Sequence, residues 1–422
     1  MISILSSGYG RLHLAQSAEC LAKVGVNIKL LCGWVPKNPN GWLVRLCSKI
    51  VGRDLSSSMK KRMVRLINNG EVITCAWADF FCNAMFWFDR KIFHRKFHGQ
   101  AAFIAWNIFG WQSQRYLKKF VQPHNTIFHV RSGAGQGGAI KTARKYGMKV
   151  LVDHSALHPE QTESNLKEDY ERWNISVPIA PNNGVWKNVI ADCAEADILM
   201  VNATHIRDSF IERGYDSAKI RVVYLGVRDD FRDVNIKRVK SGKKNDIPKV
   251  LFTGAFYLLK GAEYILESLK ILKERGVIVH YDIVGSVIAP KKLLEKYSNL
   301  PITYYGQVPQ EELKQFLTNS DIYLFPSLAD GCAQSGMEAL TAGLPVVATY
   351  QSGLPIKDGE TGCVVPMKDA KTIADKIEWL IAHPEERIRL GYNAANMMRH
   401  NYTWEKYAEN VKNIYDEMLC KR

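Results

Sequence analysis

The sequence predicts an α/β protein made of two doubly wound, Rossmann-like domains that face each other across a cleft. Two observations predict this class. The 422 residues exceed the ~250–300 residues at which one hydrophobic core stops growing. Short apolar segments also alternate with segments of helical periodicity, an order typical of parallel sheets with helices on both faces. A stretch rich in Lys, Arg and Asp, from Asp229 to Pro248, divides these elements into two series and is predicted to be an interdomain linker.

The first series begins at the amino terminus. A short apolar strand, a glycine turn, a helix and a second strand follow one another, and the same order returns after residue 125. The predicted elements are strand Ile2–Leu5, a turn with Gly8 and Gly10, helix Leu14–Val24, strand Val26–Cys32, strand Thr126–Val130, turn Gly133–Gly138, helix Ala139–Tyr146 and strand Lys149–Val152.

The second series begins at Lys249 and has the same alternation. Open parallel sheets of this kind bind ligands at the carboxyl ends of their strands, so the cleft between the two sheets is the expected site. The predicted elements are strand Val250–Thr253, helix Gly261–Glu274, strand Val277–Val284, strand Ile302–Tyr305, helix Gln310–Thr318, strand Ile322–Phe325, helix Gln334–Thr341 and strand Val346–Ala348.

The composition, with 46% apolar and 23% charged residues, is that of an ordinary globular protein. The longest apolar candidate, Ala101 to Trp111, is shorter than the ~18 residues that span a bilayer. The first residues lack the basic and long apolar regions of a secretory signal. The nine cysteines are scattered without a Cys-x-x-Cys pair, which favours free thiols in a reducing compartment over disulfides or structural zinc. We therefore expect a cytoplasmic protein.

The net charge of +15 is concentrated in one segment. Between Gly41 and Phe120 there are 14 Lys and Arg against 4 Asp and Glu, together with five tryptophans and nine phenylalanines. Basic residues interleaved with aromatic rings suit a lipid headgroup surface, because the cations meet phosphate while the rings lie at the interface. The alternative is an aromatic core with a solvated basic face. We expect peripheral contact with the anionic inner face of the cell membrane.

The segment from Phe325 to Val346 carries the strongest chemical pattern. A buried strand ends at Pro326, a turn of small residues with Asp330 and Gly331 follows, and a helix is predicted from Gln334. The N–H groups of Gln334 and Ser335 at the helix start suit a phosphate because they lack partners within the helix. Asp330 and Glu338, eight residues apart, could bind sugar and ribose hydroxyls on either side of it. The alternative is an acidic cap and a solvated carboxylate.

This segment resembles the signature of the large family 4 of retaining glycosyltransferases, which have the GT-B fold. That signature runs Pro-Ser, then Glu-x7-Glu, then Ala-x-Ala-x-Gly-x-Pro-Val-Val. The chain has Asp330 where the family has the first glutamate, which keeps the charge and shortens its reach by one methylene. Residues that match are Pro326, Ser327, Gly331, Glu338, Gly343, Pro345 and Val346.

A second resemblance concerns the diphosphate. The segment from Leu251 to Gly261 resembles the family's Gly-Arg-x4-Lys-Gly, in which Arg and Lys hold the leaving group; Gly254 and Lys260 are present and Ala255 stands at the arginine position. A lysine acts on phosphate as a point charge, so the resemblance implies that Lys260 still serves. Arg11 and Arg228 are candidates to replace the arginine. The alternative for each is a solvated surface arginine.

Further segments of the chain also resemble the family. The loop with Gly306 and Val308 resembles the one that lies against the nucleotide base, and 357–366 and 401–404 match as well. The resemblance implies a closing helix that crosses back onto the first domain. The expected division is therefore 1–235 as the acceptor-binding domain, 236–400 as the nucleotide-sugar domain, and 401–422 as the returning helix.

His154 comes directly after a predicted strand, at the edge that opens on the cleft. In the family a histidine at this kind of position faces the donor sugar, so we expect His154 to act with Asp330 and Lys260. The alternative is a structural histidine. Gly8 and Gly10, in the first glycine turn, are expected to help bind the donor.

A competing pattern lies at Gly133–Gly138, which satisfies Gly-x-Gly-x-x-Gly between a strand and a helix and has Asp153 twenty residues after Gly133. This is the fingerprint of dinucleotide binding, with an acidic partner for the ribose. It keeps open an NAD-dependent oxidoreductase or epimerase. We interpret it instead as a glycine turn lining the cleft. A third hypothesis, an inactive GT-B sugar-binding module, follows from Ala255.

The resemblance and the residues together predict a retaining glycosyltransferase. Its donor is expected to be a nucleotide-diphosphate sugar. Its acceptor is expected to be a saccharide, namely a polyprenyl-diphosphate-linked glycan of a cell-surface polysaccharide such as lipopolysaccharide or capsule. Retention is implied by the family alone. We expect no cofactor, no metal and no nucleic-acid partner.

Overall fold

The computed structural model describes residues 1–10, 13–36, 38–52, 54–60, 62–67, 70–94, 96–120, 125–179, 181–182, 184–228, 231 and 247–420. Most of the predicted linker from Asp229 to Pro248, and the candidate Arg11, lie outside these residues.

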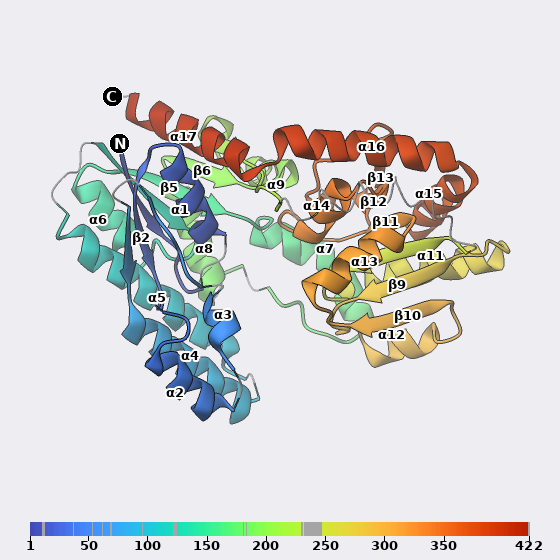
Figure 1. Ribbon diagram of the computed structural model, residues 1–422, viewed down its shortest axis with the longest axis horizontal. Coiled ribbons are helices and arrows are strands. Elements are labelled where there is room, and N and C mark those ends of the chain that lie inside the picture. The colour runs from blue at the N-terminus through green and yellow to red at the C-terminus, as the bar shows by residue number, and fades with distance from the viewer. Residues whose placement is uncertain are drawn as a thin grey trace.

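Two parallel β-sheets, of seven and six strands, organise the chain (Figure 1). All pairings between neighbouring strands are parallel. The first sheet has the order β3 (Glu71–Thr74), β2 (Asn27–Cys32), β1 (Ile2–Ser6), β4 (Thr126–Arg131), β5 (Lys149–His154), β6 (Ile198–Val201), β7 (Ile220–Val222). The second has the order β10 (Ile302–Gly306), β9 (His280–Val284), β8 (Lys249–Thr253), β11 (Ile322–Phe325), β12 (Val346–Thr349), β13 (Cys363–Val365).

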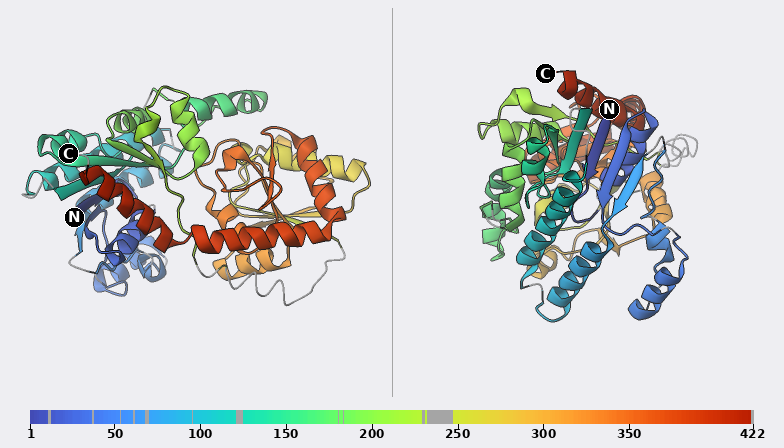
Figure 2. Two further views of the ribbon diagram at one scale, coloured as in Figure 1. Left: turned by 90° about the horizontal axis from the view of Figure 1, so that it is seen from above. Right: turned by 90° about the vertical axis from the view of Figure 1, so that its left-hand side faces the viewer.

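Helices cover both sheets and give the two halves of the molecule their outer layers (Figures 1 and 2). In the first half they are α1 (Leu14–Lys23), α2 (Trp42–Val51), α3 (Ser56–Lys60), α4 (Ala76–Lys91), α5 (His98–Leu117), α6 (Ala139–Lys145), α7 (Pro159–Arg172), α8 (Gly184–Ala194) and α9 (Thr204–Ile211). In the second half they are η4 (Leu258–Lys260), α11 (Ala262–Glu274), α12 (Lys291–Lys296), α13 (Gln310–Asn319), α14 (Gln334–Thr341), η5 (Tyr350–Ser352), α15 (Ala370–Ala382), α16 (Pro384–Asn401) and α17 (Trp404–Cys420).

The strand order reverses once in each sheet, between β1 and β4 in the first and between β8 and β11 in the second. At such a point the loops that follow the two strands leave to opposite faces of the sheet, which opens a crevice at the carboxyl edge. We call these two places the first and the second switch point. They are where the fold itself places ligand sites.

The last helix, α17, returns to the first sheet (Figure 2). Its apolar side lies in one buried cluster with α1 and the first strands, and its polar groups are matched there too. The Tyr415 hydroxyl accepts a hydrogen bond from Ser3 at 3.0 Å and lies 2.6 Å from His129 Nδ1. The Tyr407 hydroxyl lies 2.9 Å from Ser17 Oγ. α17 is therefore part of the core that supports the first sheet.

Helices α2, α4 and α5 extend beyond the first sheet as two arms (Figures 1 and 2). α4 and α5 pack on each other through a small cluster that includes Ala78, Cys82, Ala105 and Phe109. Their outer surfaces, and that of α2, leave large apolar side chains exposed. We call this surface the aromatic face; it includes Trp42, Leu43, Leu46, Trp77, Phe80, Phe81, Trp87, Phe88, Ile92, Phe93, Phe97, Phe103, Ile104 and Trp111.

The aromatic face carries basic residues and little accessible acid. Arg90, Lys91 and Lys96 are exposed on it. Two of the four carboxylates of the segment, Asp79 and Asp89, are buried instead. No helix among the described residues is long and apolar enough to cross a bilayer.

Candidate active site

Lys260 and Asp330 meet at the second switch point. Lys260 ends η4, which follows β8, and Asp330 lies in the turn after β11. The Lys260 ammonium contacts the Asp330 carboxylate directly, and both side chains are mostly buried. Lys260 also lies over the ring of Phe325, 5.3 Å from its centroid. The two strand ends that a doubly wound sheet uses for ligands therefore carry a cation and a carboxylate in contact.

The backbone fixes this arrangement through the loop that holds Lys260. The carbonyl of Leu259 accepts hydrogen bonds from Leu328 N at 2.8 Å and from Ser327 Oγ at 3.1 Å. Gly261 has φ of +79°, and a side chain there would overlap the carbonyl of Pro326. Glycine is required at this place because the two loops approach each other closely. The predicted Lys-Gly pair thus brings Lys260 to Asp330.

Helix α14 begins beside these residues with an uncapped amino terminus. No side chain caps it, and its first turn has no acidic residue. Gln334 is exposed and Ser335 half-buried, so this end of the helix is open to an anion. Burial raises the pKa of Glu338, one turn further along, to about 7, although the charge of Arg228 opposes this shift.

A rim of glycines follows the neighbouring strands of the second sheet. Gly254 after β8 and Gly306 at the end of β10 have positive φ, and open space lies where each side chain would be. Gly285 after β9 packs so closely on the Gly254 carbonyl that a side chain would overlap it. The backbone along this edge is consequently bare, which lets a flat or charged ligand approach it.

Two residues complete the outer end of this edge. Val308, in the loop predicted to lie on a nucleotide base, packs against the core. Arg228, one of the two candidate arginines, donates to Gln310 Oε1 at 3.1 Å and influences Glu338. The structure therefore places Arg228 beside the predicted ribose group.

His154 is the last residue of β5, as predicted, but it is only 1% exposed. Its Nδ1 lies 2.8 Å from Ser132 Oγ, and its ring packs edge-on against Phe210. Burial, reinforced by the charge of Arg131, lowers the pKa of His154 to about 3, so the ring is neutral at physiological pH. Its buried Nε2 has no hydrogen-bond partner among the described residues.

The Asp330 turn nevertheless reaches the first sheet. Gly331 lies so close to the carbonyl of Ser155, the residue after His154, that a side chain on Gly331 would overlap it. His205 Nε2 donates to the Asp330 carbonyl at 2.8 Å. His205 lies in the first turn of α9, four residues after β6 ends, and it was not predicted because that four-residue strand has no clear signal in the sequence. A histidine in the first turn of the helix that follows β6 also lies near the carboxyl edge of the sheet, and that position is the signal that could have found it.

Helix α7 makes a second contact between the two halves of the molecule. The Tyr264 hydroxyl donates to the Asp169 carboxylate at 2.8 Å, and Asn165 Nδ2 donates to the Leu328 carbonyl at 2.8 Å. Burial raises the pKa of Asp169. α7 thus holds the same Leu259–Leu328 loops that position Lys260.

The competing glycine pattern has a structural role, because its glycines face residues of the same half of the molecule. The Asp192 carboxylate accepts hydrogen bonds from Gly133 N at 2.7 Å and Gly135 N at 2.8 Å. Side chains at Gly135 and Gly138 would overlap Asp192 and Gln114. An internal carboxylate therefore occupies the amides that would bind a dinucleotide phosphate.

Asp153, the predicted ribose partner of that pattern, is already paired with other side chains of the first half. The Asp153 carboxylate lies 2.7 Å from His13 Nε2 and 3.1 Å from Arg131 Nη1, and it is buried. Burial alone would raise the pKa of Asp153, but His13, His129 and Arg131 hold it well below its ordinary value. This carboxylate stabilises the first sheet from inside.

The first glycine turn divides between two environments. Gly8 has φ of +64° and is buried, and a side chain there would overlap Trp106. Gly10 is exposed, with open space around it. At the first switch point, only Gly10 of these two predicted residues lies where a ligand could reach it.

Comparison with known proteins agrees with this geometry. HepE from Anabaena, in complex with UDP and glucose, superposes on 98% of this chain and 99% of its own with a TM-score of 0.60 and 12% identity. Two parallel sheets with their helices, arranged in this way, are the GT-B fold of glycosyltransferases. The chain is a GT-B protein.

Sequence comparison narrows the class further. Residues 233–397 match the family of glycosyl transferases group 1. D-inositol 3-phosphate glycosyltransferase of Corynebacterium efficiens is 26% identical over 67% of this chain and 74% of its own length. The putative colanic acid biosynthesis glycosyltransferase WcaL of Salmonella typhimurium is 31% identical over 32% of this chain and 39% of its own. The chain spans about half the length of other curated relatives it matches, 51% and 59%.

Proposed function

We propose that the protein is a retaining glycosyltransferase that transfers a sugar from a nucleotide-diphosphate sugar to a lipid-linked saccharide. One observation carries the proposal. The second switch point gathers Lys260, Asp330 and the uncapped start of α14, which are a cation, a carboxylate and an anion-binding helix end. The group 1 match covers these residues, and HepE was solved with UDP and glucose.

The donor diphosphate would lie between Lys260 and the N–H groups of Gln334 and Ser335. These groups stabilise the negative charge that develops as the sugar–phosphate bond breaks. In the protein without donor, Lys260 is paired with Asp330. Donor binding would transfer Lys260 to the diphosphate and free Asp330 for the hydroxyls of the sugar.

The nucleoside would lie along the glycine rim. Its base would meet the Gly306 loop near Val308, and its ribose would bind Glu338. The bare backbone at Gly254 lets the diphosphate approach β8. His154 would complete the donor-sugar side once its buried Nε2 becomes accessible through movement of the Gly331 turn. The acceptor would attack from the leaving-group side, which gives retention.

A panel of nucleoside diphosphates tests the donor site. We expect UDP, GDP or ADP to raise the melting temperature of the full-length protein, and NAD to have no effect. Asp192 already occupies the Gly133 turn, so protection by NAD alone would contradict the proposal. The anomeric configuration of the product, read by NMR, tests retention, and an inverted product would refute it.

An inactive sugar-binding module is the second candidate, because Ala255 stands where the family has an arginine. Such a module would bind the nucleotide without releasing it from its sugar. Single-turnover transfer with the donor identified by the panel separates the two. Binding without any transfer to a range of lipid-linked saccharides would favour the module.

The aromatic face supports a cytoplasmic protein that works at the inner face of the cell membrane. It exposes rings and cations together and buries two of its carboxylates. We expect sedimentation with anionic vesicles at low salt. Arg90→Glu with Lys91→Glu should weaken this sedimentation strongly. Lys291→Glu with Lys292→Glu makes the same change of charge on α12, outside the aromatic face, and should leave sedimentation nearly unchanged. Equal sedimentation of the two double variants would argue against the face.

A further inference from the structure

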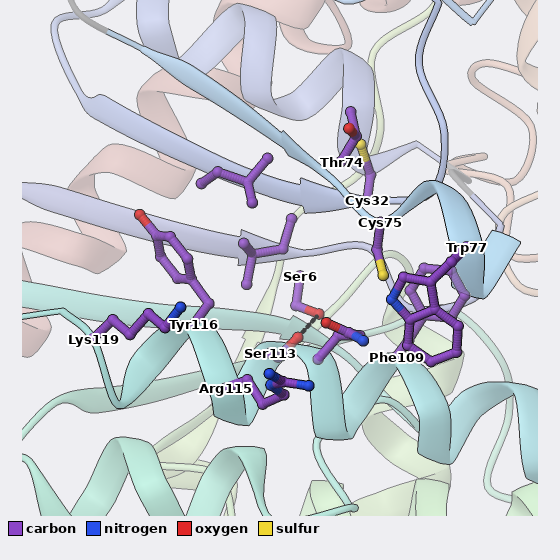
Figure 3. Close-up of a pocket in the computed structure, with 13 residues that line it drawn as sticks. Ser6, Cys32, Thr74, Cys75, Trp77, Phe109, Ser113, Arg115, Tyr116 and Lys119 are labelled. Carbon is purple, nitrogen blue, oxygen red and sulfur yellow. Dashed lines mark hydrogen bonds between the residues drawn. The ribbon is translucent and has the colours of Figure 1, made fainter.

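A cavity of about 300 Å³ lies in the first half of the molecule, away from the donor site (Figure 3). It is bounded by β1, β2 and β3 on one side and by α5 on the other. All of the described residues that line it belong to the first half of the molecule. Its volume is at the lower end of the range of small-molecule sites.

The lining of this cavity has one sign of charge. Among the described residues that line it, Arg115 and Lys119 are the charged ones and none is a carboxylate. The Arg115 guanidinium lies 4.8 Å from the centre of the Trp111 ring. The buried Nε2 of Gln112 has no hydrogen-bond partner among the described residues. Because a buried amide donor without a partner is costly, the cavity offers an anion two cations and an unused donor.

The rest of the lining is largely apolar. Leu31, Ile73, Phe109 and Trp77 surround the cavity, and the Ser6 and Ser113 hydroxyls bond each other at 2.8 Å. From Phe109 to Tyr116 the cavity follows two turns of α5, about 10 Å. Its shape suits a short length of hydrocarbon chain next to a phosphate.

The cavity adjoins both the aromatic face and the active edge. Trp77 lines it, is 52% exposed, and meets Trp111 edge-on at 6.2 Å between ring centroids. Ser6, Cys32 and Thr74, the last residues of three strands, also line it. His154 ends β5, two strands from β1, so along the sheet edge Ser6 and His154 are about 10 Å apart.

We propose that this cavity binds the phosphate-bearing end of the lipid-linked acceptor. Arg115, Lys119 and Gln112 would hold the phosphate, and the apolar lining would hold the first units of the hydrocarbon chain, which continues past Trp77 to the membrane. The saccharide would extend along the sheet edge to the donor site. This inference rests on the proposed function for its ligand, but the cavity can be tested alone.

Calorimetric titration with geranyl diphosphate tests the cavity. A Lys260→Ala background removes the diphosphate contact of the donor site. We expect geranyl diphosphate to bind at least about tenfold more tightly than inorganic diphosphate or geraniol, because the site needs both halves of the ligand. Equal affinity for inorganic diphosphate would overturn the proposal.

Two kinds of variant locate the binding. Arg115→Gln with Lys119→Gln removes the cations, and Thr74→Trp fills the mouth from an exposed position. Each should weaken geranyl diphosphate at least about tenfold. Lys141→Gln with Lys145→Gln removes the same charge from exposed sites on α6 and should leave affinity unchanged. If neither cavity variant weakens binding, the assignment is wrong.

Transfer assays separate this proposal from the proposed function. In an otherwise native protein, the cavity variants should raise the KM for a lipid-linked acceptor and leave the KM for the donor unchanged. Transfer that is intact in every cavity variant would overturn the cavity and leave the glycosyltransferase standing. Absence of nucleotide binding and transfer, with geranyl diphosphate still bound, would refute the function instead.

Discussion

Both switch points have a glycine turn after a strand, but different groups face the two turns. At the first, glycines after β4 turn their N–H groups inward, and the Asp192 carboxylate of the same chain accepts them. At the second, the glycine after β8 leaves bare backbone beside Lys260 and an uncapped helix. A glycine-rich turn after a strand therefore indicates that its N–H groups bind an anion, but this anion can be a carboxylate of the same chain. Only the open turn is available for a ligand.

The largest expected effect is at the open switch point. Lys260→Ala should lower turnover about 10²- to 10³-fold, as for the loss of one group that stabilises developing charge. The measurement is transfer at saturating donor. Lys270→Ala on α11 changes a half-exposed lysine of the same segment and should have little effect. Turnover unchanged in the Lys260 variant would exclude the proposed mechanism.

At the closed switch point, the expected effect is on stability. Asp192→Ala leaves the Gly133 and Gly135 N–H groups buried without acceptors, and should cost about 3 kcal/mol of unfolding free energy. Nucleotide affinity of the folded protein should stay unchanged. Denaturant unfolding measures the first and thermal shift the second, with Glu195→Ala as the neighbouring surface control. A variant that gains NAD binding would show that the turn can act as a ligand site.

Adding one methyl group to a glycine of each turn tests the difference between the two switch points. Gly135→Ala would overlap Ile140 and Asp192, so it should lower stability only. Gly254→Ala meets open space but has φ of +127°, and the strain should cost about 1–3 kcal/mol. In addition, it should weaken nucleotide binding about tenfold by blocking the approach to β8. Equal nucleotide affinity in the two variants would remove the distinction between the turns.

The two halves of the molecule should also respond differently to pH, the second half through nucleotide affinity. Burial raises the pKa of Glu338 to about 7, so its carboxylate form grows between pH 6 and pH 8. A carboxylate accepts ribose hydroxyls better than the neutral acid, and affinity should rise up to about tenfold over this range. In Glu338→Gln only the ligand's own pH dependence should remain. An unchanged profile in that variant would remove Glu338 from the ribose site.

In the first half of the molecule, protonation of buried histidines should lower the free energy of unfolding. Burial lowers the pKa of His154 to about 3 and that of His158 to about 4. The pKa values in the folded protein lie below the unfolded value near 6.5. The free energy of unfolding therefore decreases as the pH falls from the unfolded pKa toward the folded values. Between pH 6.5 and 5.5 the loss should be about 1 kcal/mol for each histidine, or about 2 kcal/mol in total. His158→Gln should reduce this slope, and denaturant unfolding at the two pH values measures it.

Most of the second half could be predicted from the sequence because its signals are local. Strand Ile322–Phe325 and helix Gln334–Thr341 have the predicted bounds, since short apolar runs and small-residue turns mark their ends. Lys260 and Asp330 were predicted at one site, and the structure brings them into contact. The predicted β9 began three residues early, at Val277, because the loop before the strand is also apolar.

What could not be predicted depends on contacts between distant residues. Asp192 meets Gly133 across 59 positions, and no local pattern indicates that pairing. The burial of His154 depends on Phe210, which follows an unpredicted strand. The basic aromatic segment was recognised by composition, but its division into the arms of α2, α4 and α5 was not. The same composition would have suited a packed core.

The return of α17 has a consequence for the order in which the protein is made. Tyr407 and Tyr415 complete the buried cluster around α1, yet they are synthesised after every strand of the second sheet. A ribosome therefore releases the second half as a finished unit while the first still exposes the apolar surface that α17 covers. Topologically, the second half of the molecule is an insertion within the first. Stalled or shortened chains should collect as species with one folded half, prone to association through the uncovered side of α1.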